Sequence, residues 1–238
     1  MLNRLYAQTV ARAPLTSADL AALGVSADLA VHYVRAGWLK RLARGVFVRT
    51  GEEPELHPSL RLLERMIPGF HVGGKTSLNW YGVRHYVAQQ ELLHLYGSVA
   101  VKLPEWFTER FPAEYHRKRL FSEPPERPLH ITPLEGRDSG PQVSTPERAM
   151  LELLSEIGVR QPLQEAKEIL ESAYSLRADV LRELLKRCTS VKTVRLCLQL
   201  GRESSLPWAQ KLNPTELPTG SARPWVARSA DGLLVLKP

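Results

Sequence analysis

The stretch that decides the fold is residues 23–47, LGVSADLAVHYVRAGWLKRLARGVF. Ser26 is a good N-cap, so it predicts the start of a helix, and Gly37 is placed to end that helix. Residues 38–42 and 46–49 then predict two short strands, because β-forming runs flank the tight turn around the glycine between them. The stretch therefore predicts a helix followed by a β-hairpin.

The residues before this stretch predict two more helices. Residues 2–10 place apolar side chains on one helical stripe. Thr16 or Ser17 is placed to cap a second, shorter helix. Three helices followed by a hairpin is the layout of a winged helix-turn-helix, so we expect a domain of this kind over residues 1–50.

The remainder of the chain predicts a second, larger domain. Residues 51–58 are polar and rich in helix breakers, which predicts a linker before a C-terminal domain of residues 59–238. We expect helices over 59–67, 75–81, 147–157, 163–173, 177–186 and 190–200, and strands over 91–96, 99–103, 129–132 and 233–236. The predicted fold class is α+β and predominantly helical: a winged helix-turn-helix followed by a larger mixed α/β domain.

One helix start stands out in the C-terminal domain, at Ser144-Thr145-Pro146-Glu147. Two arrangements fit it: a capping box between Ser144 and Glu147, or Thr145 as the cap with Pro146 in the first helical position. The densest cationic run, residues 116–119, is expected on a solvated helix or loop.

The charge is basic and unevenly distributed. The chain has 32 Lys and Arg against 25 Asp and Glu, a net charge of +7. Residues 1–50 hold seven basic and two acidic residues, a local net of +5, and a second basic region lies between residues 182 and 202. Clustered Lys and Arg favour a polyanionic partner, since phosphate neutralisation releases counterions.

The candidate contacts follow from the geometry of the motif. The helix after the turn enters the major groove, and with Leu29 and Tyr33 facing the core its outward side chains include His32 and Arg35. The hairpin adds cations suited to the DNA backbone or minor groove, with a solvated hairpin as the alternative. The predicted DNA-binding residues are Ser26, His32, Arg35, Lys40, Arg41, Arg44 and Arg49.

A possible second basic patch lies in the C-terminal domain. It consists of Arg182, Lys186, Arg187, Lys192 and Arg195. The alternative interpretation is a solvated helix face.

Residues 23–26 and 33–47 resemble the N-terminal winged helix of the AbiEi antitoxin family from type IV toxin–antitoxin systems. The similarity continues in residues 71–82, 95–97, 103–107 and 145–154. The resemblance implies a DNA-binding repressor that autoregulates its operon and counteracts a nucleotidyltransferase-like toxin, without requiring a stable complex with it. The alternative is a stand-alone winged-helix regulator with no toxin partner.

Double-stranded DNA is the expected partner. An inverted-repeat operator fits the motif, because one wing covers few base pairs. A dimer on DNA and monomers that bind cooperatively both remain open.

A rival motif is present at residues 69–76, GFHVGGKT, which match the phosphate-loop pattern G-x-x-x-x-G-K-[ST]. A working loop of this kind follows a buried strand, whereas residues 60–68 predict a helix ended by a proline. A phosphate-loop NTPase is therefore the distant alternative, and we interpret the match as a turn that enters a helix.

Metal, cofactor and membrane signals are weak. The histidines lack short paired spacing, although a spatial cluster of His71, His85 and His94 remains an alternative. Cys188 and Cys197 have neither metal-site nor disulfide spacing. With no run of ~18 apolar residues and no secretory signal, we expect a cytoplasmic protein without metal, cofactor or enzymatic activity.

Overall fold

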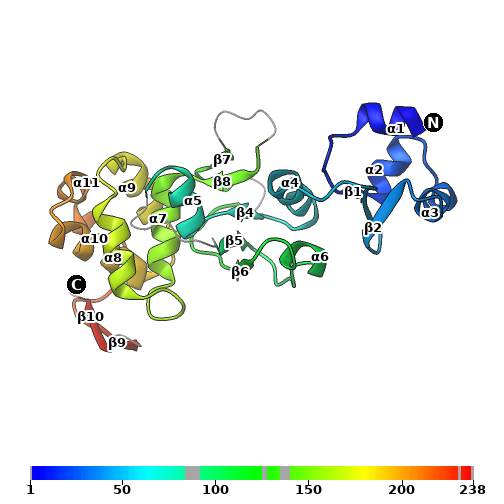
Figure 1. Cartoon of the computed structure of the whole chain (residues 1–238). Helices are drawn as coiled ribbons and strands as arrows, with labels where there is room; N and C mark the ends of the chain where they lie inside the picture. The colour runs from blue at the N-terminus through cyan, green and yellow to red at the C-terminus, as the bar shows by residue number, and fades with distance from the viewer. Residues whose placement is uncertain (1, 84–91, 125–127, 135–139, 230–231, 237–238) are drawn as a thin grey trace. The chain divides into compact units, whose positions relative to one another are not determined.

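The computed structural model describes residues 2–83, 92–124, 128–134, 140–229 and 232–236 (Figure 1). The chain forms two compact units. The N-terminal unit contains Met1–Ile67, Val101–Pro112 and Pro133–Pro141, and the C-terminal unit contains Pro68–Ala100, Ala113–Thr132 and Gln142–Pro238. None of the helices in the described part of the chain combines the length and hydropathy that a membrane span requires.

The N-terminal unit has the predicted order of three helices and a hairpin. Its elements are α1 (Leu2–Gln8), β1 (Leu15–Thr16), α2 (Ser17–Ala22), α3 (Ala27–Arg35), β2 (Leu39–Ala43), β3 (Val46–Arg49), α4 (Leu56–Met66) and α6 (Glu105–Thr108). The strands form an antiparallel sheet in the order β1-β3-β2. Strand β1 was not predicted, because two residues carry no periodicity.

Side-chain caps fix where the first helices begin. Thr16, not Ser17, caps α2 through a capping box with Asp19. Ser26 caps α3 as predicted, with its Oγ accepting from the Leu29 amide at 3.3 Å. The helices and sheet enclose one core, made of Leu5, Leu15, Leu20, Val25, Ala30, Tyr33, Leu39 and Phe47.

The boundaries of the two compact units differ from those of the predicted domains 1–50 and 59–238. Helix α4 begins at Leu56, inside the expected linker 51–58, and belongs to the N-terminal unit. Pro58 does not prevent this, since proline is tolerated in the first turn of a helix, where its missing N–H has no partner to lose.

The C-terminal unit is built on a five-stranded mixed sheet. Its strands are β4 (His71–Val72), β5 (Leu93–Gly97), β6 (Ala113–Arg117), β7 (Ile131–Pro133) and β8 (Gln142–Ser144), in the order β6-β5-β4-β8-β7. Strands β5 and β6 run parallel, as do β4 and β8, whereas β4 and β5 are antiparallel.

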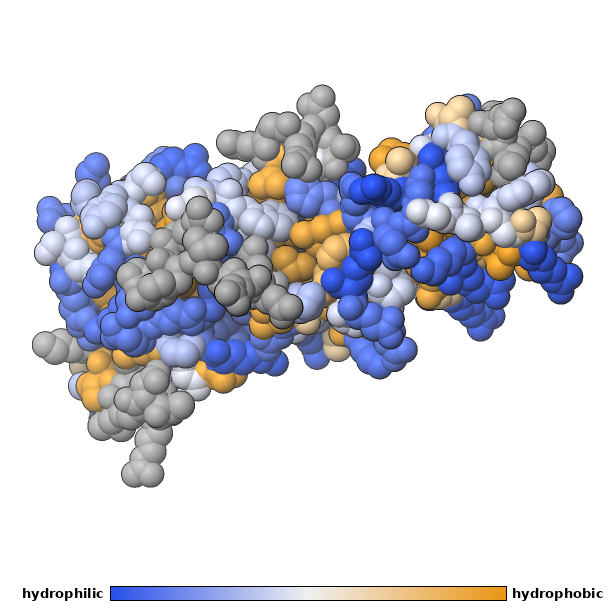
Figure 2. All heavy atoms as spheres, in the orientation of Figure 1, coloured by the Kyte–Doolittle hydropathy of each residue, from blue (hydrophilic) through white to orange (hydrophobic). Residues whose placement is uncertain are grey.

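Helices complete this unit. They are α5 (Gly74–Trp80), α7 (Pro146–Ser155), α8 (Leu163–Glu171), α9 (Ala178–Lys186), α10 (Val191–Glu203) and α11 (Pro207–Gln210), followed by a 3₁₀ turn (Pro214–Glu216) and the hairpin of β9 (Trp225–Ser229) and β10 (Gly232–Leu236). Figure 1 shows α8 to α11 gathered at one end of the unit, beside α7. Figure 2 shows hydrophilic residues over much of their visible face, as expected of helices whose apolar sides point inward.

Most predicted helices are confirmed to within a few residues, but two local predictions needed correction. Residues 99–103 form no strand. The run 116–119 was expected on a solvated helix or loop, but His116 and Arg117 end strand β6 and His116 is 2% exposed; Lys118 and Arg119 lie in the loop that follows, with Arg119 exposed. Of the two arrangements expected at the start of α7, the structure has Thr145 in the cap position with Pro146 as the first helical residue, and the Ser144 hydroxyl donates to Glu152.

Helix α7 carries a fully buried carboxylate that joins four elements. Glu152 Oε1 accepts from His71 Nε2 on β4 at 3.0 Å and from Arg148 Nε at 2.8 Å. Its Oε2 accepts from the Gly74 amide at 3.1 Å and from Ser144 Oγ at 2.8 Å. Burial raises the pKa of Glu152, but the charge and hydrogen bond of His71, helped by Arg148 and Ser144, outweigh it and bring the pKa to about 2.

These contacts predict that the C-terminal unit loses stability in acid. Glu152 and Glu156 both have pKa values lowered from 4.5 to about 2. A carboxyl with a depressed folded pKa stabilises the fold above its unfolded pKa, and that stabilisation is lost as the pH falls toward the folded pKa. We expect the urea midpoint, followed by circular dichroism, to fall steadily as the pH drops from about 4.5 toward 2.

The variant Glu152→Gln keeps the shape of the side chain and removes its titration. It should be less stable at neutral pH and show a shallower acid slope than the wild type. A midpoint that stays constant through this pH range in the wild type would contradict the assignment.

Candidate nucleic-acid interface

The turn between α2 and α3 presents one face of α3 outward. Gly24 adopts φ +82°, a left-handed conformation that glycine takes without steric cost, and Val25 after it is buried. Along α3, Ala30 and Tyr33 are buried, whereas His32 and Arg35 are exposed. The predicted outward face is therefore present. Asp28, also exposed, lies in the first turn, where an acid interacts favourably with the helix dipole.

The hairpin forms the wing, and its tip is fastened to α2. Gly45 lies at the turn with φ +76°, and its carbonyl accepts from the Ser17 amide at 2.9 Å. Arg44, beside it, is exposed. Arg41 lies over the Phe47 ring at 5.6 Å, which orients its guanidinium along the wing.

A hollow of about 560 Å³ lies between α2, α3 and the wing. Its floor is made of small side chains, among them Ala18, Ala21 and Ala27, and Arg41 and Arg44 also line it. Small residues let a partner approach the helix backbones closely, and the two guanidinium groups supply positive charge at the same place. This combination suits a phosphate backbone.

Three of the predicted contact residues carry charge that the fold leaves unneutralised. Across the described residues, Arg35, Arg41 and Arg44 make no ion pair. The nearby acid Asp19 is already engaged, since the hydrogen bond from Arg65 on α4 lowers its pKa to about 2. Lys40 is exposed but pairs with Glu53 at 3.1 Å, so it must give up that weak surface pair to reach DNA. Ser26 is exposed at the N-terminus of α3.

Arg49 was predicted to contact DNA, but the structure places its side chain inside the N-terminal unit. Its side chain is buried, and Nη2 donates to the carbonyls of Tyr6 at 2.8 Å and Thr9 at 2.5 Å, while Nη1 pairs with Glu52 at 3.3 Å. The guanidinium also stacks on the Tyr6 ring at 4.8 Å. Arg49 therefore fastens α1 to β3, and its guanidinium is not available to a ligand.

The predicted second basic patch is also largely corrected by the structure. Arg195 is buried and donates to the carbonyls of residues 219, 221, 223 and 236, which fastens the C-terminal segment to α10. Lys192 donates to the carbonyls of Ser155 and Ile157, and burial lowers its pKa. The patch is thereby reduced to three residues of the α9 region: Arg182, which donates to the Lys211 carbonyl, Lys186, which lies 3.8 Å from Glu216, and the exposed Arg187.

Three groups of the phosphate-loop match that a bound nucleotide would need are occupied by protein partners. The Gly74 amide donates to Glu152, Lys75 Nζ pairs with Glu165 at 2.5 Å, and Thr76 Oγ1 accepts from the His94 amide at 2.8 Å. A Cβ at Gly73 would collide with Glu152 Oε2, so packing against this carboxylate explains the glycine. The match is a turn that enters α5, as interpreted from the sequence.

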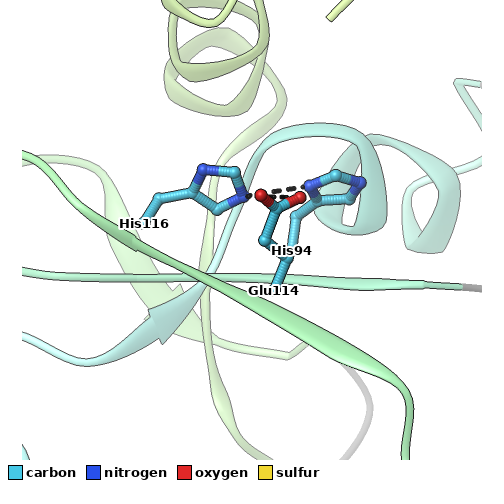
Figure 3. A group of neighbouring side chains, drawn as sticks. All are labelled: His94, Glu114 and His116. Atoms are coloured by element: carbon cyan, nitrogen blue, oxygen red, sulfur yellow. Dashed lines mark hydrogen bonds and ion pairs between the residues drawn. The ribbon is translucent and has the colours of Figure 1, made fainter. Parts of the chain in front are cut away.

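A histidine cluster exists, but it is not the one that the sequence suggested. His71 bonds to Glu152, and His85 lies outside the described residues. His94 on β5 instead meets His116 and Glu114 on β6 (Figure 3). Burial, with the charges of His116 and Lys75, lowers the pKa of His94 to about 4. The spacing of Glu114 and His116 at i and i+2 was the available signal, but it has meaning only on a strand, and β6 was not predicted.

The geometry of α2, α3 and the wing defines the N-terminal unit as a winged helix-turn-helix domain. Two family models match the chain: an AbiEi antitoxin N-terminal domain of transcriptional regulators over residues 1–89, and a transcriptional regulator described as AbiEi antitoxin of the type IV toxin–antitoxin system over residues 90–237. The chain therefore belongs to the AbiEi antitoxin family of transcriptional regulators.

A solved structure gives the same architecture. The chain is similar to the crystal structure of the RV2827C protein from Mycobacterium tuberculosis, with 16% identity, a TM-score of 0.59, and coverage of 95% of this chain and 87% of that one. At this identity the likeness shows the fold alone. No match was found among curated proteins.

The role of Arg49 can be tested by its replacement with Met. We expect Arg49→Met to destabilise the N-terminal unit by about 2–3 kcal/mol, because carbonyls of α1 lose their buried donor. Hydrogen exchange measured by mass spectrometry should show faster exchange in peptides from α1 and β3. The matched control Arg44→Met, at an exposed position, should leave these rates unchanged, and equal rates in both variants would contradict the assignment.

Proposed function

We propose that this protein is a sequence-specific DNA-binding repressor that acts as the antitoxin of a type IV toxin–antitoxin system. It autoregulates its operon and counteracts a nucleotidyltransferase-like toxin. The observation that carries the DNA-binding half is a set of exposed arginines that make no ion pair among the described residues: Arg35 on α3, beside the exposed His32, and Arg41 and Arg44 on the wing. The antitoxin half is supported by the family to which the chain belongs.

Each element has a separate task in this proposal. Helix α3 lies in the major groove, where Arg35 reads guanine O6 and N7 and His32 adds a weaker base or phosphate contact. Ser26 and the α3 N-terminus hold a phosphate. Arg41, Arg44 and Lys40 on the wing contact the backbone or the minor groove, which positions the domain without reading sequence.

The partners follow from the size of this surface. One α3 and one wing span few base pairs, so we propose an inverted-repeat operator occupied by two copies, as a dimer or by cooperative binding of monomers. The toxin is a functional partner, and a physical complex is not required. The protein acts in the cytoplasm, without an enzymatic role of its own. A neighbouring reading frame with nucleotidyltransferase motifs distinguishes an antitoxin from a stand-alone regulator.

The wing is tested by Arg44→Ala. We expect weaker binding to all duplexes, and a slope of log K against log salt that is shallower by about 1, because one phosphate contact is lost. Fluorescence anisotropy with the protein's own upstream DNA and with an unrelated duplex, over a series of salt concentrations, measures both. Arg202→Ala, at an exposed position on α10, is the matched control and should bind as the wild type does. Salt-independent binding by the wild type would refute the proposal.

Helix α3 is tested by Arg35→Ala. We expect a loss of about 1–3 kcal/mol on the upstream DNA and a smaller loss on the unrelated duplex, so that the ratio of the two affinities falls. His32→Ala should move the ratio in the same direction by a smaller amount. If Arg35→Ala weakens binding to both duplexes equally, Arg35 contacts phosphate and does not read the bases.

A further inference from the structure

The side chains of His94, Glu114 and His116 converge on one face of the sheet in the C-terminal unit. In the parallel pairing of β5 and β6, His94 lies opposite Glu114, and His116 follows two residues after Glu114. Residues two apart on a strand point to the same face. Figure 3 shows the two imidazoles and the carboxylate facing one another, and one ligand atom from each residue lies within 4.8 Å of the others.

We propose that His94, Glu114 and His116 bind one divalent transition-metal ion of the Zn²⁺ type, with water in the fourth position. Two imidazole nitrogens and a carboxylate oxygen are a ligand set that zinc prefers. The distances fit: His94 Nδ1 and His116 Nε2 are 3.1 Å apart, and His116 Nε2 is 4.0 Å from Glu114 Oε2. They bracket the roughly 3.3 Å between ligand atoms in a tetrahedron with bonds near 2 Å.

A small hollow lies beside the two imidazoles. His94 and His116 border about 10 Å³, the size of one water-sized particle, and the other walls include Glu156 and Arg160 but not Glu114. Tyr96 stacks on the His116 ring at 4.6 Å, which limits its rotation. The site is thus small and partly pre-oriented.

The residues behind the ligands orient them. Arg160 Nε lies 2.9 Å from Glu114 Oε1, which leaves Oε2 directed toward His116. Glu156 Oε2 lies 3.7 Å from His116 Nδ1, and a carboxylate behind a ligating histidine is a frequent feature of zinc sites. With the ion on Nε2, the Nδ1 proton points to Glu156, so Arg160 Nη1, now 3.2 Å from Nδ1, turns away from it. The Arg160 side chain is 48% exposed, so its guanidinium can make this small shift as a unit while Nε stays near Glu114 Oε1.

The surrounding charges are balanced before an ion enters. Around the cluster, Lys75 pairs with Glu165, Lys118 with Glu156 and Arg160 with Glu114. Among the described residues around the cluster, three cations thus meet three carboxylates, so these cations are compensated before the ion binds. Glu114 keeps its ion pair with Arg160 through Oε1 and binds the ion through Oε2.

The test uses the full-length protein, treated with a chelator and then titrated with Zn²⁺ and, separately, Co²⁺. We expect one ion per chain by equilibrium dialysis, together with the visible absorption bands of tetrahedral Co²⁺. Affinity should fall about 10-fold or more in His94→Ala and in Glu114→Gln. The second variant keeps the shape of a part-exposed side chain, so it tests the site even if His94→Ala folds poorly.

The matched control is His130→Ala, which removes a histidine that pairs with Glu183 outside the cluster. It should bind Zn²⁺ as the wild type does. The proposal is overturned if the folded wild type binds no ion from a few equivalents of Zn²⁺. It is also overturned if Glu114→Gln, folded by circular dichroism, retains full affinity, or if His130→Ala loses as much affinity as the cluster variants.

Discussion

The buried carboxylate of Glu152 is the constraint on which the C-terminal unit depends. Its helix, α7, is buried on all sides, so the charges on Glu152 and Arg148 must be satisfied inside the unit. Glu152 does this by binding β4, the start of α5 and Ser144, while Arg148 continues to Glu123 at 2.9 Å. Removal of any one partner leaves a buried charge with fewer contacts, which is far more costly than the loss of a surface ion pair.

The N-terminal unit uses a cation in the same way. Arg49 is held by the backbone carbonyls of Tyr6 in α1 and of Thr9 just after it, by Glu52 and by the Tyr6 ring. Because this guanidinium fixes β3 against α1, the wing is attached to the helical core at its base as well as through Gly45 at its tip. A wing held at both ends presents Arg41 and Arg44 in a defined place, so less conformational entropy is lost when a ligand binds.

The sequence predicts what depends on local chemistry and misses what depends on distant partners. The Ser26 cap, the wing turn and the helices of the C-terminal unit carry local signals, and these are confirmed. An arginine looks the same in sequence whether it faces solvent or carbonyls some 40 residues away, so Arg49 and Arg195 were misassigned. Strand β6 was missed because its most buried residue is a histidine, His116, and not an apolar residue.

The net charge of +7 counts every basic residue of the chain and so overstates the number of cations that are available at the surface. Four basic residues use their charged groups for hydrogen bonds within the fold: Arg49, Arg148, Arg195 and Lys192. Within the described part of the chain, the exposed arginines of α3 and the wing make no such bonds and stay available to a ligand. If the wing residues Lys40, Arg41 and Arg44 each neutralise one phosphate, one domain has a salt slope of only about −3. So few phosphate contacts give weak binding at physiological salt. Two copies on one operator double the number of contacts and therefore the slope. The small number of free cations is thus the physical reason to expect an inverted repeat.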